Sequence, residues 1–462
     1  MSATSQLGPN LAARQKAPAD GEPPRWVVPA LLAVPFLIVV AASRGLTQTV
    51  QTFHGGDETV YHYPTIVRFA HQWPNIDLVH YPAAQTPLFH ILMATLSKVV
   101  GLEIWRLRLF SVLISYLAAL MLLHLLRRRR GLELPAALVL TLLVVLSPYV
   151  FGDSFLLLTD NMALGLIFVA IDQLERFRER PRLLPFAFAA LAACAAVLTR
   201  QSTVFVFVIA FGYLVLASPR LRWWPRLEAL GLLGLAAVPM GLLALAWGGL
   251  VPIGADSSSC GLCGTGAGRV DQAGAGVFVR SVGFTLAAAG VYGAVLLGPA
   301  LVLRWRRGQL GTAELRAARP VLAGAVALAA LLLLAGPLRS HVGDAGWLWR
   351  VADHSPELLG SSLLFWLLTP IGAVVLALRW RAAPRDWLAP LFLGAFLLVA
   401  LTTRLGYQKY YDPYALLALV FTIRPREMTR AHYLGVAVLI AGSIAYMLSF
   451  VVGLNAAVKP PH

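Results

Sequence analysis

The feature that most constrains this chain is a series of long apolar runs separated by short loops. A helix needs about 20 mainly apolar residues to cross roughly 30 Å of hydrocarbon, because only a helix pairs all its own backbone groups there. Of 462 residues, 58% are hydrophobic and 13% charged, more apolar side chain than a soluble domain buries. We therefore expect an all-α polytopic membrane protein with about 13 transmembrane helices. The apolar runs lie near residues 26–43, 107–126, 134–151, 155–173, 183–199, 201–217, 229–250, 277–303, 320–337, 358–378, 387–402, 413–423 and 432–453.

The connecting loops alternate between two compositions. One set is rich in arginine, and the other is poor in Arg and Lys but rich in Gly, Asp, Ser and aromatic residues. Positively charged loops stay in the cytoplasm, so we expect the second set to face outward. The formal charge of +16 follows this loop pattern, which indicates a membrane topology and no nucleic-acid partner. The basic loops are residues 127–130, 175–182, 219–226, 304–320, 379–385 and 424–430.

The remaining segments complete the expected organisation. Residues 1–24 are polar and rich in Pro and Ala, which predicts a disordered cytoplasmic tail. Residues 25–462 predict a single integral-membrane domain, whose first helix is not cleaved as a signal peptide. The longest outward loop, 45–104, is expected to carry interfacial helices over 64–72 and 87–102.

Two adjacent acids, Asp57 and Glu58, follow the first apolar run on the side expected to face outward. One interpretation is a solvated turn after the preceding glycines. The other is a general base, in which a carboxylate takes a proton from an attacking hydroxyl. Spacing alone leaves both interpretations open.

Three polar residues interrupt the apolar runs near their expected outward ends. Asp160 lies inside the segment that starts near Phe155, where an acid is costly and faces a cavity or a partner. Arg200 and Gln201 mark the turn between two apolar runs, because the stretch 183–218 is too long for one span. Arg200 either extends toward the interface, pairs with Asp160, or binds an anionic phosphate.

A second group of cations lies near the C-terminus, in the stretch "TTRLGYQKYYDPY" at 402–414. Interfacial tyrosines are common in membrane proteins and by themselves indicate no site. Lys409, however, is one of only four lysines in the chain. Together Arg200, Arg404 and Lys409 are therefore candidates for an outward-facing anion site.

Other patterns favour structural roles. Cys260 and Cys263, in "CGLC", suit a local disulfide in an oxidising compartment, although their pairing stays open. Histidines crowd the first outward loop without the spacing of metal ligands on a helix, so hydrogen bonding is the preferred interpretation. We expect neither a metal nor a cofactor. These histidines are His54, His62, His71, His80 and His90.

The polar segments together resemble the GT-C class of membrane glycosyltransferases, and more narrowly the dolichyl-phosphate-glucose-dependent alpha-1,2-glucosyltransferases. The resemblance covers residues 50–205, where the similar segments follow one another in the same order as in the family, and residues 404–424. The similar segments are "GDETVYHYPTIVRFA" with Asp57, Glu58 and His62; "YPAAQTPLFH" with Thr86 and Pro87; "SPYVFGDSFLLLTDNMALGLI" with Thr159 and Asp160; "TRQSTVFV" with Arg200 and Gln201; and "KYYDPY" with Lys409, Tyr410, Pro413 and Tyr414.

The resemblance implies an inverting hexosyltransferase. It would move a hexose, with glucose as the expected sugar, from a polyprenyl-phosphate donor to a hydroxyl of a lipid-linked or envelope glycan. The arginine-rich sequence favours a bacterial relative, working at the extracytoplasmic face of the inner membrane. Asp57 would act as the base and Glu58 would orient it. The residues expected to bind the donor phosphate or sugar are Arg200, Gln201, Lys409, Arg404, Asp160, Tyr410 and His62.

A multi-pass transporter or lipid-linked-glycan flippase is the alternative class, because it too has many helices and a few buried charges. Transporters usually show internal repeats and helices broken at the midplane. The sequence shows no repeated half, and its polar residues gather toward one face. This distribution favours the transferase.

Overall fold

The computed structural model describes residues 24, 26–46, 55–216, 223–253, 277–307, 312–339, 346–382, 386–402, 407–425 and 427–457. Several predicted features lie outside these residues. They are the N-terminal tail apart from Pro24, the donor-site candidate Arg404, and the cysteines Cys260 and Cys263.

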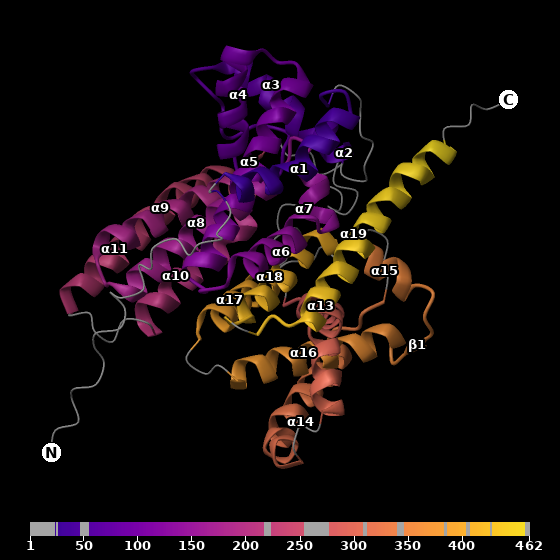
Figure 1. The fold of residues 1–462 in the computed structure, drawn as a ribbon. Coiled ribbons are helices and arrows are strands. Elements are labelled where there is room, and N and C mark those ends of the chain that lie inside the picture. The colour runs from indigo at the N-terminus through magenta and orange to yellow at the C-terminus, as the bar shows by residue number, and fades with distance from the viewer. Residues whose placement is uncertain are drawn as a thin grey trace.

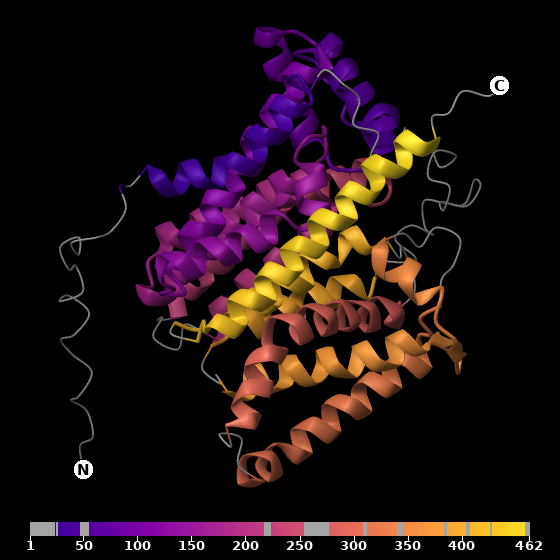
Figure 2. The ribbon, with the colours of Figure 1, turned by 45° about the vertical axis from the view of Figure 1, so that its right-hand side comes forward.

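The described chain is almost entirely helical, and its helices pack against one another along their lengths (Figures 1 and 2). The longer helices are α1 (Val27–Ala42), α5 (Ile104–Arg128), α8 (Asp160–Glu179), α9 (Leu183–Thr199), α11 (Trp223–Trp247), α13 (Val279–Arg306), α14 (Thr312–Ala335), α16 (Leu363–Ala382) and α19 (Arg430–Ala457). The shorter helices are α2 (Gly55–Asp57), α3 (Tyr63–Gln72), α4 (Leu88–Val100), α6 (Leu134–Val145), α7 (Pro148–Asp153), α10 (Phe205–Leu216), α15 (Trp347–Ala352), α17 (Leu388–Ala400) and α18 (Asp412–Thr422). Other turns are π-helical in η2 (Glu58–His62) and 3₁₀-helical in η3 (Gln201–Val204) and η4 (Gln408–Tyr410). One small antiparallel hairpin pairs β1 (Glu357–Leu358) with β2 (Ser361–Ser362).

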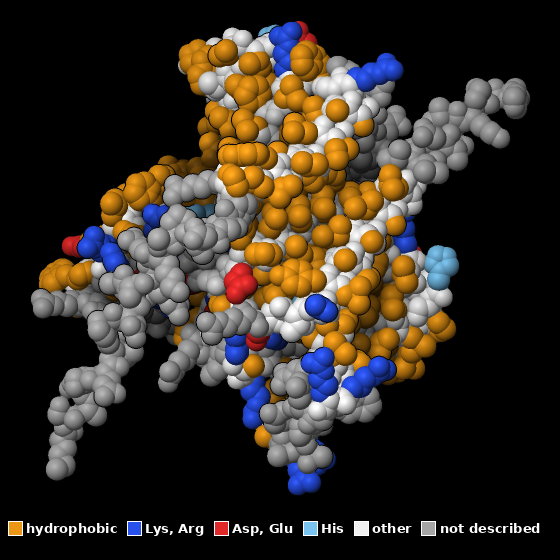
Figure 3. Space-filling model, viewed as in Figure 1, with side chains coloured by type: hydrophobic (Ala, Val, Ile, Leu, Met, Phe, Trp, Pro, Cys, Tyr) orange, Lys and Arg blue, Asp and Glu red, His pale blue; other side chains and the backbone are white. Residues whose placement is uncertain are grey.

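These helices confirm the expected all-α polytopic membrane protein. Within the described residues, six helices are long and apolar enough to cross a membrane, namely α5, α11, α13, α14, α16 and α19. Each of the other predicted apolar runs also contains a helix, among them the 20-residue α8 and the 16-residue α1. Large apolar side chains are exposed along many helices, and Figure 3 shows them covering the middle of one face. Such a surface is stable in lipid and not in water.

The first long loop forms a small helical unit at one end of the bundle, uppermost in Figure 1. Its helices α3 and α4 fall within two residues of the predicted ones and pack together. Pro64 is the second residue of α3, which continues from the π-helical turn η2, and Gly101 ends α4 at a φ of 87°. Buried Phe69 and Met93 belong to the apolar cluster that holds the unit together.

Asp160 is the first residue of α8, so the expectation that its helix starts near Phe155 was wrong. The apolar segment does not begin a helix at Phe155. Instead α7 ends at Asp153, a short turn follows, and α8 starts at Asp160. A carboxylate is favoured in the first turn of a helix because it faces unpaired N–H groups and the positive end of the dipole. The acid thus lies at a helix end.

In the second half of the chain, α13 and α16 approach very closely. A Cβ added to Gly372 would lie 1.9 Å from the backbone oxygen of Leu286, so only glycine fits there. Small residues at such crossings let helix backbones pack directly. Phe284 on α13 then stacks on Trp349 of α15 with ring centroids 4.6 Å apart, and also contacts Tyr411 beside η4. This aromatic packing fixes the position of η4.

Candidate active site

Asp57 and Lys409 form an ion pair, with Oδ2 of the acid 2.7 Å from Nζ of the lysine. Asp57 is the last residue of α2, and Lys409 is the middle residue of η4. The Asp57 side chain is 42% exposed, whereas that of Lys409 is 6% exposed. The structure thus places an accessible carboxylate in front of a buried ammonium group.

Arg200 and Asp160 form a second ion pair, with Nη1 of the arginine 2.7 Å from Oδ2 of the acid. This is one of the interpretations that the sequence left open. Nη1 also donates to the hydroxyl of Thr159 at 3.1 Å, and Nε donates to that of Ser202 at 3.2 Å. The extended backbone of Arg200 ends α9, which aims its side chain at the start of α8. The arginine side chain is only 10% exposed.

Tyr410 joins the two ion pairs. Its ring centroid lies 4.9 Å from the guanidinium carbon of Arg200 and 5.3 Å from Nζ of Lys409. A cation near an aromatic ring is stabilised by the negative face of the ring. The structure therefore brings five predicted residues into one cluster, which we call the cation cluster: Asp57, Asp160, Arg200, Lys409 and Tyr410.

Both cations of this cluster stay charged. Burial lowers the pKa of Lys409, but the acidic groups around it, the phenol of Tyr410 and the carboxylate of Asp57 first, raise it above its ordinary value. Burial likewise lowers the pKa of Arg200, and the carboxylate of Asp160 leads the groups that raise it above the usual range. Asp153 contributes to both shifts. The site therefore holds two fixed positive charges near physiological pH.

Glu58 differs sharply from its neighbour Asp57. It is completely buried, and its carboxylate accepts two hydrogen bonds from Arg108, at 2.9 and 2.5 Å. It accepts a third from the backbone N–H of Leu157 at 2.9 Å. Arg108 also donates to the carbonyl of Leu46 at 3.2 Å. Glu58 thus ties the first loop to α5 and to the turn before α8, which positions Asp57.

His62 stacks on His90, with ring centroids 5.1 Å apart and Nδ1 of His62 2.9 Å from Nε2 of His90. Burial lowers the pKa of both rings, to about 3 for His90, and the cations Arg200 and Lys409 lower that of His62 further. One ring nitrogen donates to the other, so the pair is neutral. Among the described residues, no group of three or more His, Cys, Asp or Glu side chains is arranged to hold a metal.

Gln201 lies beside the cation cluster at the start of η3. Its side-chain nitrogen donates to the carbonyl of Ala84 at 2.8 Å, which fixes the amide. Its side-chain oxygen is buried and accepts no hydrogen bond from the described residues. Thr86 donates to the carbonyl of Val197 at 2.7 Å and holds the same loop against α9. A buried acceptor without a donor is costly, and a ligand hydroxyl would satisfy it.

Sequence reasoning missed several residues that build the site. Arg108 is an arginine at the start of the apolar run 107–126, two residues after Arg106, and that signal was available. Gln408 and Asp412 hold η4: the amide nitrogen of Gln408 donates to Asp412 at 2.9 Å, and its oxygen accepts from the N–H of Leu348 at 2.8 Å. Tyr292 donates to the other oxygen of Asp412. The contacts of Gln408 with Leu348 and of Asp412 with Tyr292 join distant segments, so no local pattern indicates them.

The chemical capacity of the site follows from this geometry. The exposed carboxylate of Asp57 can accept a proton from a hydroxyl. Lys409 and Arg200 are fixed cations suited to stabilise charge that develops on a phosphate, and Arg200 offers a guanidinium fork. The arrangement therefore fits a reaction in which a hydroxyl attacks and a phosphate leaves.

Comparison with known proteins bears on the same region. A family model described as dolichyl-phosphate-mannose-protein mannosyltransferase matches residues 84–247, a little over a third of the chain. No curated protein matches the sequence. Two solved structures of ArnT from Cupriavidus metallidurans are similar to the chain, one in the apo state and one bound to undecaprenyl phosphate. Their sequence identity is 14% and 16%; the alignments cover 91% and 92% of this chain and 78% of each ArnT chain, with a TM-score of 0.38 for both.

Proposed function

We propose that the chain is an inverting GT-C glycosyltransferase that uses a polyprenyl-phosphate sugar. It transfers a hexose, with glucose as the expected sugar, to a hydroxyl of a lipid-linked or envelope glycan at the extracytoplasmic face of a bacterial inner membrane. The observation that carries the proposal is the cation cluster, in which an accessible carboxylate contacts one of two buried cations. The mannosyltransferase family model supports it, because the matched segment 84–247 contains Asp160, Arg200 and Gln201.

In the proposed reaction, Asp57 accepts the proton of the acceptor hydroxyl. The hydroxyl oxygen attacks C1 of the sugar from the face opposite the phosphate, and the C1–O bond to the phosphate breaks. The bonding electrons leave with the polyprenyl phosphate, whose negative charge increases by one. Lys409 and Arg200 stabilise that growing charge, which is worth more in a site shielded from water. A phosphate is a weakly basic leaving group, so the reaction needs no general acid.

The remaining candidates have supporting roles in this mechanism. Asp160 holds Arg200 through their ion pair, and Tyr410 supports both cations. Gln201 offers its free acceptor to a sugar hydroxyl. His62 packs behind the cluster, and Glu58 positions Asp57 through the first loop. Arg404 stays a candidate on sequence alone.

The ion pair between Asp57 and Lys409 also couples the two halves of the reaction. A donor phosphate beside Lys409 competes with Asp57 for the ammonium group. The carboxylate is then released from its cationic partner and is free to accept a hydrogen bond from the acceptor hydroxyl. Donor binding would thus activate the base.

The direct test supplies purified full-length protein in lipid nanodiscs with one radiolabelled donor at a time. The donors are undecaprenyl-phosphate-linked glucose, mannose and galactose, and the acceptors are extracted bacterial envelope lipids and glycans. We expect label to move from one donor to a product of inverted anomeric configuration, with release of undecaprenyl phosphate. A parallel assay uses the protein reconstituted in vesicles. If it moves donor lipid from one leaflet of the vesicle membrane to the other and transfers no sugar from any donor, the transporter class is correct instead.

A further inference from the structure

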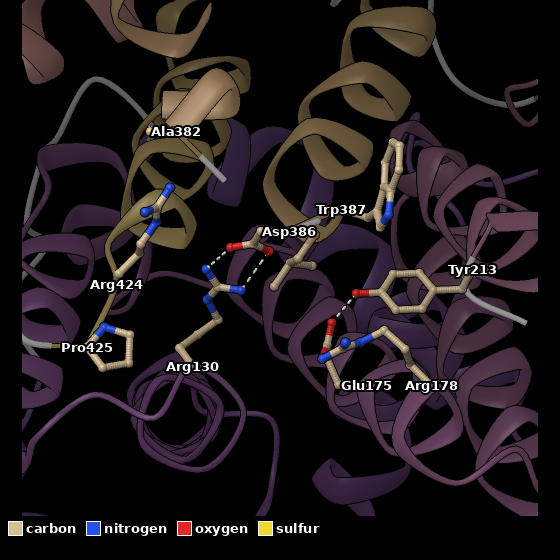
Figure 4. Close-up of a pocket in the computed structure, with 10 residues that line it drawn as sticks. Arg130, Glu175, Arg178, Tyr213, Ala382, Asp386, Trp387, Arg424 and Pro425 are labelled. Carbon is tan, nitrogen blue, oxygen red and sulfur yellow. Dashed lines mark hydrogen bonds and ion pairs between the residues drawn. The ribbon is translucent and has the colours of Figure 1, made fainter. Parts of the chain in front are cut away.

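A second polar site lies at the opposite end of the helices that carry the cation cluster. There a cavity of about 610 Å³ opens between the ends of α5, α8, α10, α16, α17 and α18 (Figure 4). Along α8, Asp160 of the cation cluster and Glu175 of the cavity are 15 residues apart, or about 22 Å. The cavity is therefore separate from the proposed catalytic site. Its volume falls within the range of about 300–1,000 Å³ that is usual for small-ligand pockets.

Two of the three arginines that line the cavity are neutralised by acids. Arg130 forms a bidentate pair with Asp386, with Nη1 2.8 Å from Oδ1 (Figure 4). Arg178 donates from Nε and Nη2 to Glu175, at 3.0 and 2.6 Å. The same acid accepts a hydrogen bond from Tyr213. These pairs form rigid walls of nearly zero net charge.

Arg424 is the third arginine, and its charge is poorly compensated. Its Nε lies 3.9 Å from Oε1 of Glu427, outside hydrogen-bonding distance. The other oxygen of Glu427 accepts from Arg379 and from the backbone N–H of Arg424. Nη2 of Arg424 is buried and has no hydrogen-bond partner among the described residues. The Arg424 side chain as a whole is 33% exposed, but this nitrogen is shielded from water. Leaving a shielded donor unpaired is costly, so a ligand acceptor in the cavity would be favoured there.

We propose that this cavity binds the phosphate group of an anionic phospholipid. Arg130, Arg178 and Arg424 against Glu175 and Asp386 leave one surplus positive charge, which matches a singly charged phosphodiester. The guanidinium group of Arg424 supplies the forked donor that such a phosphate prefers. Trp387, Leu388 and Pro425 add apolar surface for the glycerol and the first acyl carbons. Basic pockets between membrane helices commonly recognise anionic head groups in this way.

The test measures lipid retained by the purified full-length protein in native mass spectrometry, with phosphatidylglycerol and zwitterionic phosphatidylcholine as probes. We expect wild type to retain phosphatidylglycerol preferentially. Arg424→Gln should weaken that binding roughly tenfold, the effect of losing one charge-assisted contact. Arg424→Lys keeps the charge and loses the forked donor geometry of the guanidinium group. Its affinity for phosphatidylglycerol should lie between those of wild type and Arg424→Gln. Equal retention by wild type and Arg424→Gln would overturn the proposal.

The matched control is Arg128→Gln, which removes an exposed arginine from the same end of the molecule without touching the cavity. It should bind phosphatidylglycerol like wild type. If its affinity falls as much as that of Arg424→Gln, the overall positive charge at this end of the molecule attracts the lipid and the cavity does not. Unfolding temperatures without added lipid verify that each variant folds. A third arm adds inorganic phosphate. If phosphate alone gives the same Arg424-dependent rise in unfolding temperature as the lipid, the ligand is a free anion and the lipid assignment is wrong.

Discussion

Lys409 and Asp57 are 352 residues apart in sequence and 2.7 Å apart in the fold. Their contact joins the first loop, near the N-terminus, to the turn between α17 and α18, near the C-terminus. Because the Asp57 side chain is 42% exposed, the pair is screened by solvent and contributes little to stability. Its position beside Arg200 instead suits a site where a phosphate exchanges with the carboxylate.

Replacing Arg200 tests the proposed stabilisation of the leaving phosphate. We expect Arg200→Gln to lower the transfer rate by about 100- to 1,000-fold, the usual cost of losing one positioned electrostatic donor. Asp160→Asn should lower it less, because Arg200 keeps its charge and its contact with Thr159. Initial rates with the labelled donor measure both effects. Arg68→Gln is the control, since Arg68 is exposed on α3 and lies 3.7 Å from its acid partner; a comparable loss there would argue against a specific role of Arg200.

Glu58 is expected to matter for stability more than for chemistry. Removing one partner of a buried ion pair leaves the other charge uncompensated, which typically costs about 3–5 kcal/mol. Glu58→Gln should therefore unfold at a clearly lower temperature, and combining it with Arg108→Met should restore part of the loss. Thermal unfolding in detergent measures this. A Glu58→Gln protein as stable as wild type but without transfer activity would instead assign Glu58 to the reaction.

Acid should weaken the fold through His62 and His90. Both are buried and neutral, with pKa values below the ordinary 6.5 and about 3 for His90. The unfolded chain binds protons near pH 6.5 and the folded chain does not. Their contribution to stability is therefore complete above pH 6.5 and is lost as the pH falls, by about 1.4 kcal/mol per unit for each histidine.

The unfolding temperature measured between pH 7 and pH 5 tests this pH dependence. It should fall steadily for wild type across that range. His90→Gln keeps a hydrogen-bonding side chain and removes one titrating ring, so its slope should be about half as steep. Identical slopes for the two proteins would show that other groups control the response to acid.

Local patterns in the sequence predicted much of the fold. Helix length and apolar composition placed α5, α13 and α19 closely, because a spanning helix must be long and apolar regardless of its neighbours. The Pro at the start of α3 marked that helix of the first loop, whereas the predicted segment 87–102 ran past Gly101, which ends α4. The start of α8 was misplaced because apolar composition continues through the turn at 154–159.

The candidate site was predictable as a set of residues but not as a geometry. Lys409 was noticed because lysine is rare in this chain, and Arg200 because it interrupts an apolar stretch. Neither signal indicates that Lys409 contacts Asp57, since tertiary packing alone brings them together. The sequence also did not indicate that Asp57 and Glu58 have separate roles. Although the two are neighbours in sequence, Asp57 at the end of α2 contacts Lys409, whereas Glu58 at the start of η2 contacts Arg108.

The most direct test of the central claim is transfer by Asp57→Asn, compared with wild type on the active donor. Asparagine keeps the size of the side chain but cannot act as a base, so the variant should bind the donor and lose transfer by about 100- to 10,000-fold. Donor affinity, measured separately, should stay the same or increase, because Lys409 is then freed for the phosphate. Transfer at the wild-type rate by Asp57→Asn would contradict the proposed role of this carboxylate.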